Sequence, residues 1–353
     1  PVVPTVRFAY SWANDFTELL EEYAESVKRR VRIEPEINVG LQHKQKILID
    51  AASGNLPDIF TFWSYETNLG DFVDSGSIID VQEYFAASQS IEQSDFFQSA
   101  MEATRIDGVN YAVPYERFYG FYVVNTEIFD DLDLRIPGTW EDIRDITPAL
   151  RERGITPLSI GSFKGDPGHL FFSALTYQSP NGYRDTVAMK ETGNFVYPGT
   201  VAAAKAVRRL IDYGAIPSNT ISAGSWDYQI HKYNEKKAAM IYTFNWNMAL
   251  FEPEIAARSH IIPVPRINSE AVDTSSFTVG GIAMNICINS ESWRDPAKRE
   301  HITRLVDWLL SDEVFVARLE QQGTFPTEKG IDIPEYKKSM YRKLEDYLQS
   351  VEI

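Results

Sequence analysis

The chain has 353 residues with a formal net charge of −16, and 44% of its residues are hydrophobic. One hydrophobic core rarely supports a chain of this length, so we expect two domains. The negative charge repels phosphates and anionic lipid headgroups, and no stretch approaches the ~20 apolar residues of a membrane-spanning helix, which argues against nucleic-acid binding and membrane insertion.

The N-terminal stretch alternates between two kinds of hydrophobic pattern. Val6, Phe8 and Tyr10 alternate with small or polar residues, which predicts a strand. The next segment carries apolar residues at helical spacing and predicts an amphipathic helix. Alternating strands and helices are typical of a parallel sheet that is covered by helices. The expected elements are a strand at 6–10, a helix at 16–30, a strand at 31–39, a helix at 42–53 and a strand at 57–63.

Polar and aromatic side chains follow the first and third predicted strands. Ligands of open parallel sheets bind at the carboxyl ends of the strands, so these side chains are candidates for ligand contacts. Trp12 also suits a core, and Asp15 suits a helix N-cap. Alternation turns one of Trp63 and Tyr65 inward, and Glu66 also suits a solvated surface. The candidates are Trp12, Asn14, Asp15, Trp63, Tyr65 and Glu66.

Residues 107–122 combine a turn, a short strand and a run of aromatic side chains. An Asp-Gly pair at the start predicts a tight turn, and Pro114 belongs at a strand end because proline cannot donate to a sheet ladder. A ligand-facing crossing between two lobes, rather than a core strand, explains an aromatic run that includes Glu116 and Arg117. Arg117 also suits a surface ion pair. The candidates here are Tyr115, Glu116, Arg117 and Tyr119.

The second half of the chain adds candidates in loops that follow predicted strands. Gly280 and Gly281 would let backbone amides approach a ligand closely, or they form a simple tight turn. Trp226 also suits an ordinary surface position. The candidates in this half are Lys164, Asp166, Trp226, Asn245, Trp246, Gly280 and Gly281.

The motifs of metal, nucleotide and hydrolase sites are missing from the sequence. The five histidines are far apart and form no HExxH unit, so we expect no metal site and no cofactor. Cys287, the single cysteine, lies among apolar residues, which predicts a buried and inert thiol. Glycoside hydrolysis needs two carboxylates beside one bond, so a carbohydrate-active enzyme stays open as an alternative. The carboxylates that it would use are Asp15, Glu66, Glu116 and Asp166.

Several segments, taken together and in order, resemble the bacterial extracellular solute-binding proteins of the sugar-binding family. The crossing segment at 107–125 is similar to the family's "dGk.Y.lP" element, although Val123 and Val124 stand where a Tyr is common before Asn125. Lys236 stands where the family's "GkAAM" element has glycine. Further matches are GNLPDIF, GTWEDI, YNEKKAAMIYTFNWNMALF, TVGGIAMNICIN and QQGTFPT.

The resemblance implies an α/β fold of the two-lobe, periplasmic-binding-protein-like type II class, with a hinge and a cleft between the lobes. Lobe one would hold residues 1–113 and 266–322, and lobe two would hold 114–265 and 323–353. The chain would cross near 113–114 and near 263–266, where Pro263 and Pro265 stiffen an extended segment. We expect the C-terminal helices to pack on lobe two.

The resemblance also implies a function. The protein would be the extracytoplasmic substrate-binding subunit of an ABC-type importer, which captures a carbohydrate, an oligosaccharide by expectation, through hinge closure and has no catalytic residues. Trp246 ranks first among the candidates because the family commonly places a tryptophan of the cleft there. The expected partners are the carbohydrate and the importer's permease subunits, and the expected state is a monomer.

Alternatives remain for location, role and ligand. The location would be periplasmic, or the cell surface if a leader and a lipid anchor precede this sequence. The rival role among binding proteins is the ligand-sensing lobe of a signalling receptor. Arg117 and Lys164 leave room for an acidic sugar or another anion, and Glu116 and Asp166 leave room for a cation.

Overall fold

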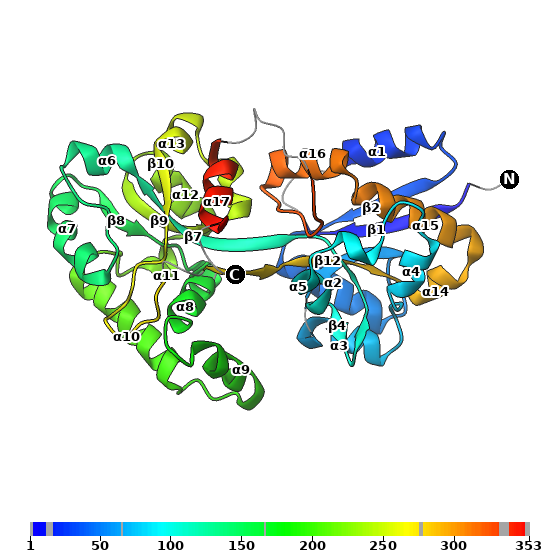
Figure 1. Cartoon of the computed structure of the whole chain (residues 1–353), viewed down its shortest axis with the longest axis horizontal. Coiled ribbons are helices and arrows are strands. Elements are labelled where there is room, and N and C mark those ends of the chain that lie inside the picture. The colour runs from blue at the N-terminus through cyan, green and yellow to red at the C-terminus, as the bar shows by residue number, and fades with distance from the viewer. Residues whose placement is uncertain are drawn as a thin grey trace. The chain divides into compact units, whose positions relative to one another are not determined.

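The computed structural model describes residues 3–11, 17–64, 66–165, 167–274, 278–331 and 339–349. The chain divides into two compact units (Figure 1). Unit 1 comprises Pro1–Phe118 and Gly281–Pro334, and unit 2 comprises Tyr119–Gly280 and Glu335–Ile353. Each unit is built around its own β-sheet with helices packed against it.

The sheet of unit 1 has five strands in the order β2-β1-β3-β12-β6. β1 runs parallel to β2 and to β3, as the alternation of predicted strands and helices indicates. β12 is antiparallel to both of its neighbours, β3 and β6, although it follows β3 by more than two hundred residues. The strands are β1 (Thr5–Tyr10), β2 (Arg32–Ile37), β3 (Ile59–Trp63), β6 (Val113–Pro114) and β12 (Met284–Ile288).

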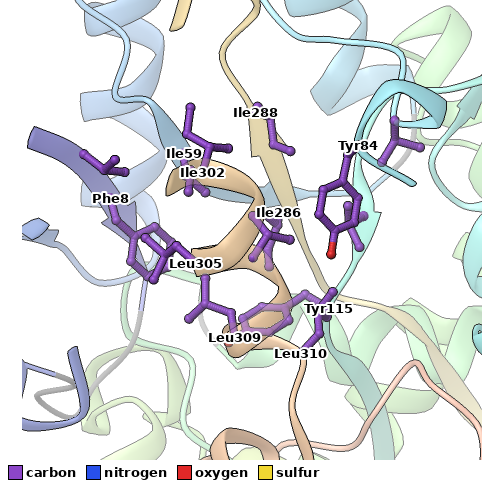
Figure 2. Packing of buried hydrophobic residues seen from close by; sticks show 14 of the residues in the cluster. Phe8, Ile59, Tyr84, Tyr115, Ile286, Ile288, Ile302, Leu305, Leu309 and Leu310 are labelled. Carbon is purple, nitrogen blue, oxygen red and sulfur yellow. The ribbon is translucent and has the colours of Figure 1, made fainter. Parts of the chain in front are cut away.

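Helices cover both faces of this sheet because successive side chains of a strand point in opposite directions. On one face, Phe8 and Ile286 belong to the same buried cluster as Leu305 of α15, which Figure 2 shows from close by. On the other face, Phe60 and Cys287 are fully buried in a second cluster with residues of α2 and α3. The helices of unit 1 are α1 (Thr17–Ser26), α2 (Leu41–Ala52), α3 (Glu66–Asp74), α4 (Gln82–Ala87), α5 (Gln98–Glu102), α14 (Ser290–Arg294), α15 (Pro296–Leu309) and α16 (Asp312–Gln322), with a 3₁₀ turn η1 (Gln93–Asp95).

The sheet of unit 2 has four strands in the order β10-β7-β9-β8, and β11 pairs with β7 outside that path. β7 is antiparallel to β9 and β10, whereas β8 runs parallel to β9. All seven residues of β9 are buried, so both faces of this central strand lie in the core. The strands are β7 (Arg117–Asn125), β8 (Thr156–Ser159), β9 (Ala238–Phe244), β10 (Ser259–Ile262) and β11 (Val279–Ile282).

Local sequence signals explain where several elements of unit 2 begin. Thr139 accepts a hydrogen bond from the amide of Asp142 at 3.1 Å, and the Asp142 carboxylate accepts one from the amide of Thr139 at 2.9 Å. This reciprocal cap starts α7 at Trp140, within the GTWEDI segment. The helices are α6 (Thr126–Asp131), α7 (Trp140–Glu152), α8 (Gly168–Thr176), α9 (Gly182–Thr192), α10 (Pro198–Tyr213), α11 (Thr220–Ala223), α12 (Trp226–Asn234), α13 (Pro253–Arg258) and α17 (Ser339–Gln349), with 3₁₀ turns η2 (Phe163–Gly165) and η3 (Asn245–Leu250).

The C-terminal helix α17 belongs to unit 2, where the sequence places it. Met340 and Leu344 are buried, and the Lys343 ammonium donates hydrogen bonds to the carbonyl oxygens of Ala256 at 3.0 Å and of Ser259 at 2.7 Å. These carbonyls lie at the end of α13, where a helix has unsatisfied acceptors and attracts a cation. The lysine therefore attaches the end of the chain to unit 2.

Two short turns follow the sequence signals. Asp107 and Gly108 have φ values of 50° and 86° and connect β4 (Arg105–Ile106) to β5 (Val109–Asn110), which confirms the predicted turn. Lys236 has a φ of 56°, a left-handed conformation that glycine adopts without strain. This conformation explains why a glycine stands here in the family pattern that the segment resembles.

The division into units differs from the predicted boundaries. β6 (Val113–Pro114) pairs with β12 inside unit 1, so the first crossing lies after Phe118 rather than near 113–114. The Ile267 amide donates to the Gln178 side chain at 2.8 Å, which keeps the segment after Pro265 in unit 2 as far as Gly280. The third crossing follows Pro334 rather than residue 322, because Thr327 donates a hydrogen bond to the Pro114 carbonyl at 2.9 Å within unit 1.

Truncating a core side chain of unit 1 tests this packing. Leu305 is fully buried, so we expect Leu305→Ala to lower the free energy of unfolding by about 2–5 kcal/mol through lost burial and the cavity left behind. Leu41→Ala is the matched control, because Leu41 is 75% exposed in the same unit and its truncation should change stability by less than about 0.5 kcal/mol. Urea unfolding followed by circular dichroism measures both, and equal effects would contradict the assigned core.

Candidate functional site

The carboxyl ends of the parallel strands in unit 1 are joined by hydrogen bonds through small polar side chains. The Ser11 amide at the end of β1 donates to the Thr61 hydroxyl at 3.2 Å, and the Ser11 hydroxyl accepts from the Gly40 amide at 2.9 Å. These bonds bring the ends of β1 and β3 together with the start of α2. Three predicted site residues, Trp12, Asn14 and Asp15, follow Ser11 directly but lie outside the described residues.

Trp63 occupies the same edge, at the end of β3. Its side chain is partly exposed, and its ring packs edge-on against Phe62 with centroids 5.4 Å apart. The Lys44 ammonium lies 5.8 Å from the Trp63 ring centroid and donates a hydrogen bond to the Asn68 side chain at 2.7 Å. The sequence reading missed Lys44 and Asn68, which the fold brings to the edge from the starts of two helices. Of the predicted neighbours, Tyr65 lies outside the described residues, and the Glu66 side chain is not described.

His43 is buried beneath this edge and has a structural contact. Its Nε2 donates to the Thr61 carbonyl oxygen at 2.7 Å, and burial lowers the pKa of His43. The imidazole is therefore neutral at pH 7, and it connects α2 to β3 without adding charge to the edge.

Glu116 and Tyr115, two predicted ligand contacts, surround a buried arginine in unit 1. Arg318 of α16 is 1% exposed, and its guanidinium forms an ion pair with the Glu116 carboxylate. The same guanidinium lies 3.6 Å from the centroid of the Tyr115 ring, which is itself 1% exposed. A buried charge needs such partners, so Glu116 balances Arg318 in this structure.

Arg117 attaches the returning chain to the same region. Its amide donates to the Phe325 carbonyl at 3.0 Å, and its Nε donates to the Pro326 carbonyl. Its guanidinium also lies 4.3 Å from the centroid of the Phe97 ring. These contacts attach Arg117 to other segments of unit 1, and its role as a ligand contact stays a prediction.

Glu328 completes this cluster and has an unusual protonation. Its carboxyl group accepts a hydrogen bond from the Thr327 amide at 3.0 Å and, at 3.1 Å, shares the hydrogen of the Thr327 hydroxyl with the Pro114 carbonyl. Burial raises the pKa of Glu328 to about 7, although these bonds and the nearby Arg318 act to lower it.

Unit 2 presents three aromatic rings, which we call the aromatic platform: Trp226, Phe244 and Trp246. The Phe244 and Trp246 rings are stacked, with centroids 4.6 Å apart and an interplanar angle of 8°. Trp226 meets both rings edge-on, at 5.9 Å from Phe244 and 5.8 Å from Trp246. Phe244 is fully buried, whereas the two tryptophans are partly exposed. The platform therefore has a buried base and two accessible indoles.

Buried polar side chains hold the platform on the sheet. The Asn245 side-chain oxygen accepts a hydrogen bond from the Tyr119 amide at 2.8 Å, which joins the end of β9 to β7. Gln229 of α12 is fully buried and donates to the Tyr242 carbonyl at 2.7 Å. The same Gln229 accepts from the Gly161 amide at 3.2 Å, in the loop after β8. Asn245 and Tyr119, both predicted as ligand contacts, thus contribute backbone support, and Gln229 was missed by the sequence reading.

The loop after β8 holds two further predicted residues, Lys164 and Asp166. Phe163, which precedes them, is half exposed, and its amide donates to the Gly224 carbonyl at 3.0 Å, two residues before Trp226. The Lys164 side chain is not described, and Asp166 lies outside the described residues. Gly280 and Gly281 lie within strand β11 rather than in a tight turn, and the boundary between unit 2 and unit 1 falls between them.

Within the described residues, no group of three or more His, Cys, Asp or Glu side chains is arranged to hold a metal ion. None of the helices in the described part of the chain has the length and apolar character needed to cross a bilayer.

Comparison with known proteins gives one family and several structural relatives. The family model of the bacterial extracellular solute-binding proteins matches residues 13–314. The osmoprotective compounds-binding protein GgtB of Synechocystis sp. is 27% identical over 115 residues, which span 32% of this chain and 27% of that protein. The match thus covers about a quarter of that relative's length.

Solved structures support the same fold. A structure from work on xylan utilization by Caldanaerobius polysaccharolyticus has a TM-score of 0.80 at 19% identity, covering 94% of this chain and 84% of that one. A chitin oligosaccharide binding protein also has a TM-score of 0.80, at 18% identity, covering 96% of this chain and 86% of that one. These likenesses confirm the predicted two-lobe α/β fold of the periplasmic-binding-protein type.

The raised pKa of Glu328 predicts a pH dependence of stability. Between about pH 4.5 and pH 7 the folded state keeps a proton that the unfolded chain has released, so the stabilisation is complete below about 4.5 and is lost as the pH rises through 7. Glu328→Gln keeps a neutral side chain at every pH. We therefore expect the melting temperature of Glu328→Gln, relative to the wild type, to rise between pH 5 and pH 8.

Differential scanning calorimetry at several pH values measures this difference. Glu313→Gln, at an exposed position of α16, is the control for the loss of one acidic residue and should show no such trend. A difference between Glu328→Gln and wild type that stays constant with pH would contradict the assigned protonation.

Proposed function

This chain belongs to the family of bacterial extracellular solute-binding proteins, and on that premise we propose that it is the substrate-binding subunit of an ABC-type importer for a carbohydrate. The ligand would be captured and released without chemical change. Its delivery to permease subunits, its preference for an oligosaccharide and its action as a monomer are parts of the same proposal.

The aromatic platform is the observation that carries the proposal. Sugar rings present C–H faces that pack on flat aromatic rings, while their hydroxyl groups need donors and acceptors close by. Trp226 and Trp246 offer partly exposed indoles, and both of these rings pack against the buried Phe244 ring and against each other. A rigid aromatic surface loses little conformational entropy when a ligand binds.

Structural relatives agree with a carbohydrate ligand. One relative is a chitin oligosaccharide binding protein, and another comes from work on xylan utilization. At below 20% identity these likenesses support the fold, so the ligand class of this chain rests on its own side chains.

Each unit would contribute one set of ligand contacts. In unit 1 the set is Trp63 with Lys44 and Asn68, and in unit 2 it is Trp226 and Trp246. A ligand that contacts both sets only in a closed arrangement favours that arrangement by its differential affinity, and the closed form is what a permease would recognise. Tyr115, Glu116 and Arg117 have partners within unit 1, so the proposal does not depend on them. The candidates outside the two sets stay predicted contacts: Trp12, Asn14, Asp15, Tyr65, Glu66, Tyr115, Glu116, Arg117, Tyr119, Lys164, Asp166, Asn245, Gly280 and Gly281.

An enzymatic alternative finds little support among the described residues. Glycoside hydrolysis needs two carboxylates beside one bond. The Glu116 carboxylate is engaged by Arg318, and the other carboxylates considered for this role lack a described position. No described contact favours the signalling-receptor alternative over the importer.

A thermal-shift screen against mono- and oligosaccharides, including uronic acids, tests the proposal. A ligand that binds only the folded state at a hundredfold excess over Kd stabilises it by about 2.7 kcal/mol, which raises Tm by a few degrees in a chain of this size. A selective hit with the sugar recovered intact is the expected result. Shortened sugar products would favour an enzyme, and a panel without any hit would remove the carbohydrate assignment.

Removing the outer ring of the platform should weaken carbohydrate binding. We expect Trp246→Ala to raise Kd at least tenfold, or about 1.4 kcal/mol, because a stacking face and its buried area are lost. Trp246→Phe keeps a flat ring and should lose less. Isothermal titration calorimetry with the sugar found in the screen measures both, and an unchanged Kd for Trp246→Ala would remove this side chain from the site.

A further inference from the structure

Gly120 of β7 lies directly opposite the base of the aromatic platform. In the antiparallel pairing of β7 with β9, Gly120 is the register partner of Phe244. A Cβ atom built at Gly120 would lie 2.8 Å from Cζ and 2.9 Å from Cε1 of the Phe244 ring, and 2.4 Å from the Tyr242 hydroxyl oxygen. The Tyr242 hydroxyl and the Phe244 ring therefore both occupy the space that any side chain at position 120 would need.

The backbone at Gly120 has little freedom to move away from the ring. The carbonyl of Gly120 accepts a hydrogen bond from the Thr278 hydroxyl at 2.7 Å. The amide of the preceding residue, Tyr119, donates to the side chain of Asn245, the residue that follows Phe244. Because the backbone is held in place and the region is tightly packed, an added methyl group would displace the neighbouring side chains.

The Tyr242 side chain is equally confined. It is fully buried, and its ring centroid lies 5.4 Å from those of Tyr122 and Phe244 and 5.6 Å from that of Phe171. The Phe244 ring, by contrast, borders the partly exposed Trp246 and Trp226. An added methyl group at position 120 would therefore push Phe244 toward the platform surface.

We infer that Gly120 is a positioning residue, whose missing side chain sets the depth of Phe244 and, through the stack, the orientation of Trp246. Gly120 is also the second residue of unit 2 after the first crossing, so the platform is packed on the strand that connects the two units. The consequence for ligand binding rests on the proposed function, but the geometric consequence does not.

Gly120→Ala tests the inference without a ligand. Two indoles in contact give a near-ultraviolet circular dichroism signal. The platform's share of that signal is the difference between the spectra of the wild type and of Trp246→Phe. We expect Gly120→Ala to change this share by at least a third, to increase acrylamide quenching of tryptophan fluorescence, and to lower Tm by about 2–6 °C. A purely structural role would lower Tm and leave the platform signal unchanged, which would overturn the inference.

Two further variants show whether the effect of Gly120→Ala comes from its contact with the Phe244 ring. Gly138→Ala is the control, because Gly138 is exposed in the same unit and its added Cβ would find its nearest neighbour at 3.9 Å, so no property should change. In a protein that already carries Phe244→Ala the ring is absent. There, Gly120→Ala should lower Tm by less than half as much as it does in the wild type. An equal decrease in Tm in the wild type and in Phe244→Ala would overturn the inference, even if Gly120→Ala itself folds poorly.

A protein that carries Tyr242→Phe separates the two contacts of the added methyl group, one with the Tyr242 hydroxyl and one with the Phe244 ring. It removes the hydroxyl and leaves the Phe244 ring in place, so Gly120→Ala should still change the platform signal there. A full return to the wild-type signal would assign the effect to Tyr242 and would contradict the role given to Phe244. A wild type that binds no sugar in the screen would remove the proposed function, whereas these ligand-free spectra would still decide the role of Gly120.

Discussion

The antiparallel insertion of β12 between β3 and β6 is the interaction on which unit 1 depends. One strand supplies Ile286 and Ile288 to the core beneath α15 and Cys287 to the core beneath α2 and α3. Without it, both cores would lose a side and the sheet would expose an edge of unpaired backbone groups. The same strand receives the Tyr115 and Glu116 amides at its Met284 carbonyl, each at 3.0 Å. The crossing segment is thereby attached to unit 1 as far as Glu116.

That attachment explains why a charged cluster lies next to the crossing. Once Glu116 is fixed on β12, its carboxylate balances the buried Arg318, and Arg117 binds the carbonyls of the returning segment. A buried cation with one partner removed is strongly destabilising, so these residues are suited to holding segments of the chain together. Residues that look like ligand contacts in the sequence thus serve to unite three distant segments. Among the ligand contacts proposed here, Trp63 and Trp246 lie at or just after the ends of strands, whereas Lys44, Asn68 and Trp226 lie on helices.

In unit 2 the organising contact is the close approach of β7 and β9. A glycine on one strand admits the Phe244 ring of the other, and that ring supports Trp246 in a stack. Aromatic pairs of this kind contribute about 0.5–1.5 kcal/mol beyond the area that they bury, and they also fix the orientation of the outer ring. A platform with fixed orientation is what capture by stacking requires, since little ordering remains to be done when the ligand arrives.

The sequence by itself determined the features that depend on neighbours along the chain. The alternation at Val6, Phe8 and Tyr10 specified β1, the Asp107-Gly108 pair specified a turn, and the ordered motifs specified the family. It also singled out Trp246, which lies in the platform. Only the tertiary structure decided which distant residues meet: Glu116 with Arg318, Arg117 with Pro326, and Gly120 with Phe244. The reason is physical, because periodicity records which face of an element is buried, whereas the identity of a partner across a core depends on how separate segments are brought together.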